Sequence, residues 1–279
     1  MEVTLWGTRG SLPSPGPETV RYGGNTSCVS VFGPDGSLLV LDSGTGIRRL
    51  NSKLPQNLRR VDILLTHLHM DHILGLGFFT PLRSPAYEVH LWGPAHVARA
   101  LGLRLSRYLS PPLFPVHLRD LPCTLTLHEI SKEEFDIVEF RISSDFVCHL
   151  DPTLGYRIEA GGASLAYLPD HEPALGVAEF PETPDWTSGY DLSKQADLLI
   201  HDSQYTTEEY FQKVGYGHSS INQTLRFAEM AGVEHLVPFH HDPNHSDDQL
   251  DDLYKAAVED MQPDFMVTPG QEGMTINLA

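Results

Sequence analysis

The chain alternates short apolar runs with polar segments, a pattern that predicts strands interleaved with helices. Val61-Asp62-Ile63-Leu64-Leu65 is typical of a buried strand, since short apolar runs between polar residues favour strands. Comparable runs predict strands at 2–7, 26–32, 37–42, 61–66, 88–92, 125–128, 139–143, 155–159, 164–168, 197–201 and 235–239. Helices are expected at 94–103, where Pro94 suits the first turn, and at 219–231 and 246–260. Both halves therefore indicate sheets covered by helices.

No repeat or low-complexity linker divides the sequence, so a single domain spanning residues 1–279 is the simplest expectation. Two segments, 102–122 and 172–195, are less regular and rich in proline or in residues typical of surfaces. We interpret them as insertions over a site. Loops of this kind often carry binding residues, so these segments are expected to determine specificity.

The strongest chemical signal directly follows the predicted strand at 61–66. His67, His69, Asp71 and His72 place four potential metal ligands within six positions. A loop leaving a strand end can turn such side chains toward one point, and imidazole with carboxylate suits Zn²⁺ and related divalent ions. One ion would scarcely need both Asp71 and His72, so the motif indicates a second ion. A lone histidine is usually an ordinary core or surface residue, but a cluster at this spacing is far more specific.

The His-x-His-x-Asp-His motif after a strand resembles the signature of the metallo-β-lactamase superfamily. Leu41-Asp42-Ser43-Gly44 is similar to an earlier Asp-x-Gly turn of that family. The opening residues 7–11 (GTRGS) and residues 21–28 (RYGGNTSC) resemble its ribonuclease Z and cyclic-phosphodiesterase branch. The resemblance covers nearly the whole chain. It implies an α/β fold, a four-layer αββα sandwich with the metals at one edge of the two sheets.

The resemblance also implies the remaining ligands. His149, Asp170 and His240 are similar to the family's third histidine, bridging aspartate and last histidine. Two divalent ions are then expected per chain, with Zn²⁺ first and Mn²⁺ or Fe²⁺ as alternatives. The ligands of one ion would be His67, His69 and His149. Those of the other would be Asp71, His72 and His240, with Asp170 spanning both.

Two neighbouring histidines leave this assignment open at the level of the sequence. His241 adjoins His240, and either could bind; we favour His240 because it directly follows the apolar strand at 235–239. His171 adjoins Asp170, where a carboxylate is the more natural bridge. Both His171 and His241 are candidates for contacting substrate, or they are plain loop residues.

A hydrolase of this type needs a group that protonates the leaving oxygen in addition to an activated water. Asp71 is expected to orient or deprotonate that water. His218, in a Gly/Ser context before the final metal histidine, is similar to a catalytic histidine of ribonuclease Z-like enzymes. The segment His201-Asp202 resembles their His-acid motif, so Asp202 is expected to orient His218. The motif usually carries glutamate, and Asp202 is one methylene shorter. Capping of the following helix is the alternative role for His218.

The net charge of −18 is unfavourable for binding long polyanions, because nucleic-acid binding depends on neutralising phosphates with Lys and Arg. We therefore expect a small anionic substrate, such as a small or cyclic nucleotide, and do not expect an extended nucleic acid as a partner. Arginines concentrate between residues 99 and 119, at Arg99, Arg104, Arg107 and Arg119. Arg104 and Arg107 are candidates for a bidentate phosphate clamp, and a solvated helix face is the alternative.

Two other function classes compete with a phosphodiesterase. A carbonyl hydrolase, such as a lactonase, thioesterase or β-lactamase, would use the same metals without needing His218. A regulatory metal-binding module without turnover is disfavoured, because every ligand position expected from the family is filled. A redox di-iron protein is also disfavoured, because His69 stands where that branch usually has glutamate.

Composition adds little beyond this. Hydrophobic residues make up 41% of the chain and charged residues 20%, as in ordinary globular proteins. No apolar run approaches the ~20 residues of a membrane span, and the N-terminus lacks a signal-peptide pattern, so a cytoplasmic location is expected. The three cysteines form no Cys-x-x-Cys pair. Dimerisation is common in the ribonuclease Z branch, so a homodimer is allowed, although the sequence carries no interface signal.

Overall fold

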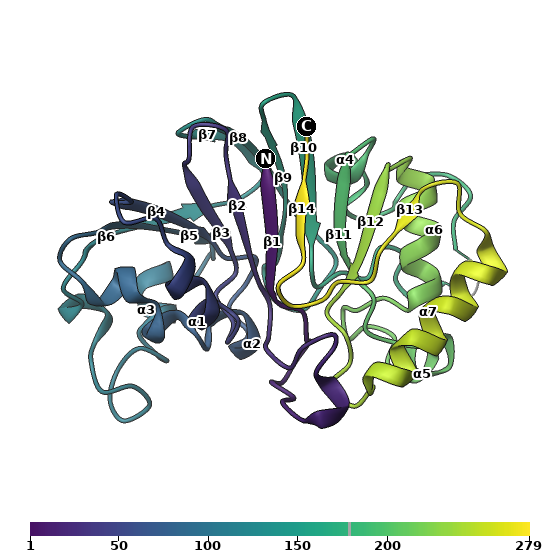
Figure 1. Ribbon diagram of the computed structural model, residues 1–279, viewed down its shortest axis with the longest axis horizontal. Coiled ribbons are helices and arrows are strands. Elements are labelled where there is room, and N and C mark those ends of the chain that lie inside the picture. The colour runs from purple at the N-terminus through teal and green to yellow at the C-terminus, as the bar shows by residue number, and fades with distance from the viewer. Residues whose placement is uncertain (178–179) are drawn as a thin grey trace.

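The computed structural model describes residues 1–177 and 180–279, and within them fourteen strands form two seven-stranded sheets (Figure 1). The first sheet has the order β14-β1-β2-β3-β4-β5-β6. Strands β3 to β6 are parallel, whereas β14, β1, β2 and β3 pair antiparallel. In this order the strands are Thr275–Asn277, Glu2–Gly7, Cys28–Phe32, Leu38–Leu41, Arg60–Leu64, Glu88–Pro94 and Thr124–Ile130.

The second sheet repeats this arrangement, with the order β13-β12-β11-β10-β9-β8-β7. Strands β10 to β13 are parallel, and β7 to β10 pair antiparallel. In this order the strands are Met266–Val267, His235–Phe239, Leu198–Asp202, Ala163–Leu168, Leu154–Ala160, Phe140–Phe146 and Glu133–Ile137. The chain ends lie side by side in Figure 1, because β14 near the C-terminus pairs with β1.

Helices cover the outer face of each sheet. On the first sheet these are α1 (Ile47–Leu50), α2 (Met70–Ile73) and α3 (Leu101–Leu105). On the second they are α4 (Tyr190–Ser193), α5 (Thr207–Gln212), α6 (Ile221–Ala231) and α7 (Asp247–Met261). One apolar cluster lies between the sheets, and one lies beneath each helical layer. The expected four-layer αββα sandwich is therefore confirmed.

A strand forms at every predicted apolar run, because such runs indicate burial, but β7, β13 and β14 were not predicted and the helix predicted at 94–103 is wrong. Strand β5 continues through Pro94 and pairs with β6 as far as Ile130. The amide of Ala95 also donates to the carbonyl of Ile130, so strand pairing overrides the local helix signal. The helix that does form, α3, begins only at Leu101, whose amide is bound by the Glu129 carboxylate.

The two segments interpreted as insertions are partly built into the fold. Segment 102–122 contributes buried Leu105, Leu109 and Leu118 to the apolar cluster beneath the first helical layer. Segment 172–195 contains α4, and its residues 178–179 lie outside the described residues. Their role in specificity, and the single-domain organisation, stay predictions. No helix in the described part of the chain is long and apolar enough to cross a membrane.

Candidate metal centre and active site

The functional side chains gather where the parallel strands of both sheets end. Asp42 directly follows β3, Asp202 ends β11 and His240 directly follows β12. The carboxyl ends of parallel strands meet at one edge of a sheet, which is where open α/β sheets place their ligands. Asp42 and His240 both have left-handed backbone conformations, with φ of 56° and 60°. Such values are rare for residues with a side chain and cluster at functional sites.

The short helix α2 organises the motif that follows β4. His69 precedes it with extended backbone, and the single turn from Met70 to Ile73 directs Asp71 and His72 inward, where both are buried. His67 is also buried, so three of the four motif side chains are withdrawn from solvent. Buried polar side chains require partners. The motif is therefore folded around an interior point and does not face solvent.

Two donor groups meet at this point. In each group, one ligand atom from every residue lies within 4.8 Å of the corresponding atoms of the others. The first group consists of His67, His69, His149 and Asp170, and the second of Asp71, His72, Asp170 and His240. Asp170, which follows β10 closely, belongs to both. The structure thus brings together all seven residues that the resemblance assigned as ligands.

Unpartnered atoms within these groups test whether the residues fit metal ions. Nε2 of His67 is buried without a hydrogen-bond partner in residues 1–177 and 180–279, and Nε2 of His72 and Oδ1 of Asp170 lie 2.9 Å apart without forming a hydrogen bond of normal geometry. Leaving such atoms unsatisfied costs about 1–3 kcal/mol each, more for charged groups. A divalent cation satisfies lone pairs that face one another, and histidine nitrogens with carboxylate oxygens suit Zn²⁺ and related ions. The site therefore fits the ions that the family implies.

Two histidines of the donor groups use their other ring nitrogen on the protein. Nδ1 of His149 lies 2.8 Å from the Gly217 carbonyl, and Nδ1 of His240 lies 2.9 Å from Oε1 of Gln204. Each of these bonds fixes the ring proton on Nδ1 and leaves Nε2 facing the interior point. Nε2 of His240 lies 3.1 Å from Oδ2 of Asp71. This arrangement is the usual way in which proteins orient metal-binding imidazoles.

Asp42 has the same orienting role for the motif itself, and sequence reasoning assigned it none. Its Oδ2 lies 2.8 Å from Nδ1 of His72, and Oδ1 accepts the amide of Thr66 at 2.8 Å. The Thr66 hydroxyl donates to the same carboxylate and lies 3.0 Å from Nδ1 of His67. Tyr167 donates its hydroxyl to Asp42 at 3.0 Å. The turn after β3 thus orients one histidine of each donor group.

The opening Gly-Thr-Arg-Gly-Ser segment packs against the second donor group. The Ser11 amide donates to Oδ2 of Asp71 at 2.8 Å. A Cβ on Gly10 would lie 2.4 Å from Nδ1 of His240, so only glycine leaves room for this ring. The guanidinium of Arg9 is fully buried and donates to the carbonyls of Asp242 and His245, which holds the loop after His240. The sequence motif was noted, but nothing in it indicated these contacts.

Charges within the site are strongly coupled. Burial alone would raise the pKa of Asp71, but neighbouring His72 and His240 outweigh it and hold that pKa far below its ordinary value. Burial likewise opposes ionisation of Asp170, yet His240, His72 and His67 lower its pKa. For His67 burial dominates and lowers the pKa, so the ring is neutral and its unpartnered nitrogen carries a lone pair.

His218 and Asp202 form a pair beside both donor groups. Nδ1 of His218 lies 2.6 Å from Oδ2 of Asp202, which also accepts the His171 amide. The His218 ring stacks on His240 at 5.0 Å between centroids and meets His149 edge-on, also at 5.0 Å. Burial lowers the pKa of His218 and raises that of Asp202. His218 precedes Ser219 and Ser220, and it is Ser220 that caps α6, so His218 is not the capping residue.

The two histidines that the sequence left open are placed elsewhere. Nδ1 of His241 contacts the Tyr254 hydroxyl at 2.9 Å, and its Nε2 contacts the Gly270 carbonyl at 2.8 Å. Both nitrogens are thus used, and the ring points away from the donor groups. His171 is fully buried, with Nδ1 2.8 Å from Nε2 of His201. Neither histidine belongs to a donor group, so the structure offers no support for a substrate contact by either.

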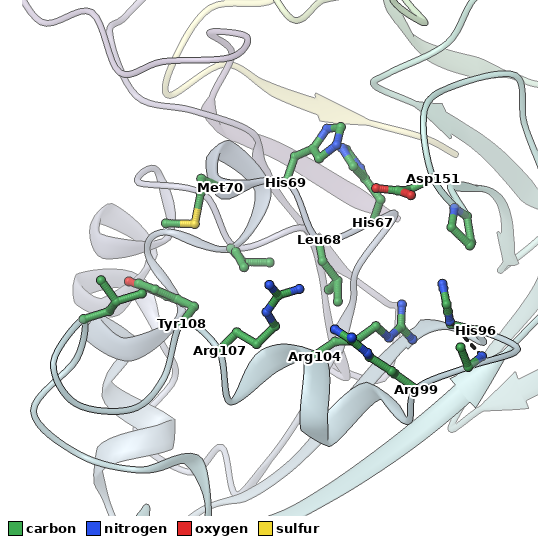
Figure 2. Close-up of a pocket in the computed structure, with 14 residues that line it drawn as sticks. His67, Leu68, His69, Met70, His96, Arg99, Arg104, Arg107, Tyr108 and Asp151 are labelled. Carbon is green, nitrogen blue, oxygen red and sulfur yellow. Dashed lines mark hydrogen bonds between the residues drawn. The ribbon is translucent and has the colours of Figure 1, made fainter.

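A cavity of about 570 Å³ adjoins the first donor group, and three of the four clustered arginines line it. Figure 2 shows Arg99, Arg104 and Arg107 on the α3 side of the cavity, with His67 and His69 across from them. Arg119 is absent from this lining and pairs with Asp120, with its side chain 81% exposed. The positive charge expected near the site is therefore present, but Arg119 is not part of it.

The fold and the donor groups together define a metal-dependent hydrolase with a metallo-β-lactamase fold. A family model described as "Beta-lactamase superfamily domain" matches residues 38–241, so the chain belongs to this superfamily. A relative named Ribonuclease Z from Staphylococcus epidermidis is 23% identical, over 95% of this chain and 96% of its own length. The resemblance inferred from the sequence is confirmed.

Solved structures agree with this fold. The short form of human tRNase Z superposes with a TM-score of 0.69 at 22% identity, covering all of both chains. Zn²⁺-bound PqqB from Methylobacterium extorquens has a TM-score of 0.70 at 20% identity, again covering all of both chains. At these identities the superpositions establish the fold alone.

One expectation from the sequence requires correction. We did not expect an extended nucleic acid as a partner, but curated relatives that match along nearly the whole chain are named ribonucleases. The argument from the net charge of −18 fails because total charge describes the whole surface, whereas binding depends on local charge. Arg99, Arg104 and Arg107 concentrate positive charge at the cavity despite the acidic remainder of the chain.

Proposed function

We propose that this protein hydrolyses nucleotide-type phosphodiesters using two divalent ions, with Zn²⁺ as the expected metal. The proposed ligands are the two donor groups described above, with Asp170 between the ions. Proteins named Ribonuclease Z among the relatives support phosphodiester chemistry, because a ribonuclease cleaves such bonds. The cavity of about 570 Å³ has room for a small nucleotide, a cyclic nucleotide or the terminal nucleotide of a longer chain.

The observation that carries this proposal is the position of His218. Its ring contacts one histidine of each donor group, while its Nδ1 is held by Asp202. Hydrolysis of an unactivated phosphodiester expels an alkoxide, which requires a proton donor in the transition state. A carbonyl hydrolase opening a strained ring has less need of such a group. The His218–Asp202 pair therefore favours phosphodiesters over lactones or thioesters.

Each proposed step can be assigned to a residue of the chain. Bound divalent ions would supply an acidified water as the nucleophile and neutralise charge on the attacked group. Asp71 orients the attacking water. The Ser11 amide donates to the Asp71 carboxylate and fixes its position. Nε2 of His218 gives a proton to the departing oxygen. Asp202 is a positioning residue that holds Nδ1 of His218 and so keeps Nε2 directed toward substrate.

The first experiment measures hydrolysis of bis(p-nitrophenyl) phosphate by protein loaded with Zn²⁺ or Mn²⁺, beside an Asp170→Ala variant. Activity that the variant lacks supports a two-metal phosphodiesterase. A fully metallated protein that cleaves a lactone but no diester refutes it in favour of a carbonyl hydrolase.

A leaving-group series then tests the role of His218. In His218→Gln, we expect a loss of about 10²–10⁴-fold in kcat for a nucleoside alkoxide leaving group, the usual contribution of general acid catalysis. The loss should be much smaller for p-nitrophenolate, which departs without a proton. Equal losses for both leaving groups, with unchanged metal content, would contradict proton donation by His218. Asp202→Asn should show the same dependence on leaving group in weaker form.

A further inference from the structure

The cavity beside the first donor group has two chemically different walls. Arg99, Arg104 and Arg107 line one side, and Asp151 lies with the metal-site histidines on the other (Figure 2). His96, Ala98 and Pro152 also line the cavity, together with the larger apolar side chains Leu68, Met70, Ile73, Tyr108 and Leu113. A ligand that fills this cavity therefore meets positive charge and an apolar surface at the same time.

The arginines are not neutralised equally by the protein. Arg104 is mostly buried, hydrogen-bonds to the Pro94 carbonyl and lies 3.6 Å from Glu129. Its Nε is buried without a hydrogen-bond partner within the described residues. Arg104 and Arg119 each pair with a carboxylate, whereas neither Arg99 nor Arg107 has an ion pair in residues 1–177 and 180–279. Two guanidinium groups at this cavity therefore have their charge available for a ligand.

We propose that this cavity binds a second phosphate of the substrate, adjacent to the phosphodiester that is cleaved. Guanidinium groups bind phosphate bidentately, because their planar N–H donors match the spacing of the phosphate oxygens. The scissile phosphate would lie at the donor groups, and the arginines lie on the opposite side of the cavity, where a second phosphate would meet them. The inference rests on the proposed phosphodiesterase function and narrows its substrate class to diesters bearing a further phosphate.

The nucleoside between the two phosphates would lie along the apolar wall. Met70 is half exposed, and Tyr108 is mostly buried but lines the cavity. Such side chains can cover a base or sugar without reading its sequence. The second phosphate has two chemical sources, the terminal phosphate of a small nucleotide and the next phosphodiester of a polynucleotide. Both present anionic oxygens to Arg99 and Arg107.

A matched pair of substrates tests the proposal. Thymidine 5′-(p-nitrophenyl phosphate) and its 3′-phosphorylated derivative share the same scissile bond and leaving group. Wild type should prefer the 3′-phosphorylated compound in kcat/KM. In an Arg99→Gln/Arg107→Gln variant this preference should fall by about 10–100-fold for each arginine, since hydrogen bonds between charged groups are the strong ones. Arg119→Gln is the matched control and should keep the wild-type preference.

A third substrate separates the two sources of phosphate. In it a second thymidine esterifies the 3′-phosphate, so that the group becomes an internal phosphodiester. A preference lost on esterification supports a small nucleotide with a terminal phosphate. A preference retained on esterification, and lost in the double variant, supports a polynucleotide. Equal kcat/KM for all three substrates would overturn the inference.

A binding measurement distinguishes failure of the second-phosphate site from failure of the proposed phosphodiesterase function. Thymidine 3′,5′-bisphosphate should bind wild type, by isothermal titration calorimetry, at least tenfold more tightly than the Arg99→Gln/Arg107→Gln variant. Equal binding, with bis(p-nitrophenyl) phosphate still cleaved by wild type, would refute the second-phosphate site alone. Absence of cleavage of every diester by metallated wild type would refute the phosphodiesterase itself.

Discussion

Replacing Asp42 by asparagine should weaken metal binding although Asp42 contacts no metal. In wild type, Oδ2 of Asp42 accepts from Nδ1 of His72 at 2.8 Å and from the Tyr167 hydroxyl at 3.0 Å, while Oδ1 accepts the Thr66 amide. Asparagine keeps one acceptor oxygen, which the Thr66 amide retains. The new NH₂ group then faces the N–H at Nδ1 of His72. Two hydrogen-bond donors therefore oppose each other.

His72 can relieve this clash only by moving its ring proton to Nε2. That atom lies 2.9 Å from Oδ1 of Asp170 and 3.3 Å from Oδ2 of Asp71, within the second donor group. A protonated nitrogen offers no lone pair to a metal. Removing such an orienting partner typically costs about 10–100-fold in metal affinity, and we expect this loss for the second ion. The first donor group should keep its affinity, because the Thr66 contacts survive.

The assay is a Zn²⁺ titration against a chromophoric chelator, combined with elemental analysis after desalting. Asp42→Asn should retain one tightly bound ion and lose the other. Tyr167→Phe is the matched control, since it removes a hydrogen bond to Asp42 without touching His72, and it should bind both ions as wild type does. If a folded Asp42→Asn protein binds two ions with wild-type affinity, the orienting role of Asp42 is wrong.

Three further predictions concern the supports of the site. Gly10→Ala places a methyl group 2.4 Å from Nδ1 of His240 and should release the second metal ion, measured by elemental analysis; full occupancy would contradict the packing argument. In wild type the Glu172 carboxylate accepts the Gly217 N–H at 3.0 Å, and Glu172→Gln replaces that acceptor oxygen with an NH₂ group. The variant should lower the free energy of unfolding by about 1–3 kcal/mol in urea titrations, and an unchanged urea midpoint would refute this prediction. Burial lowers the pKa of His201 to about 4, below its unfolded value of about 6.5, so the fold favours the neutral ring. The contribution of His201 to the free energy of unfolding is complete above about pH 6.5 and falls by at most about 3 kcal/mol as the pH decreases toward 4. Unfolding titrations of wild type and a His201→Gln variant at several pH values measure this loss. A difference in unfolding free energy that stays constant with pH would count against a buried neutral ring.

The sequence by itself determined most of the strands and the central motif, and the family resemblance that the motif carries gave the fold class, whereas β7 (Glu133–Ile137), β13 (Met266–Val267) and β14 (Thr275–Asn277) were not predicted. Strand β12 (His235–Phe239) and strand β1 (Glu2–Gly7) lie where the apolar runs predicted them, because burial of short runs is a local property of the chain. The four candidate ligands between His67 and His72 were also visible, since they lie within six positions. The remaining ligands required the family resemblance, because His149, Asp170 and His240 come from distant segments.

Only the tertiary structure decided which side chains face one another. It directs His240 toward Asp71 and uses both nitrogens of neighbouring His241 on Tyr254 and Gly270, a distinction that adjacent identical residues cannot encode. It also ends strand β5 at Pro94, where the sequence predicted the start of a helix, and delays that helix to Leu101, because pairing with β6 outweighs the local helix signal at Pro94. Apolar patterns record how deeply each residue is buried, whereas hydrogen bonds and local charge depend on which strand ends and loops meet in space.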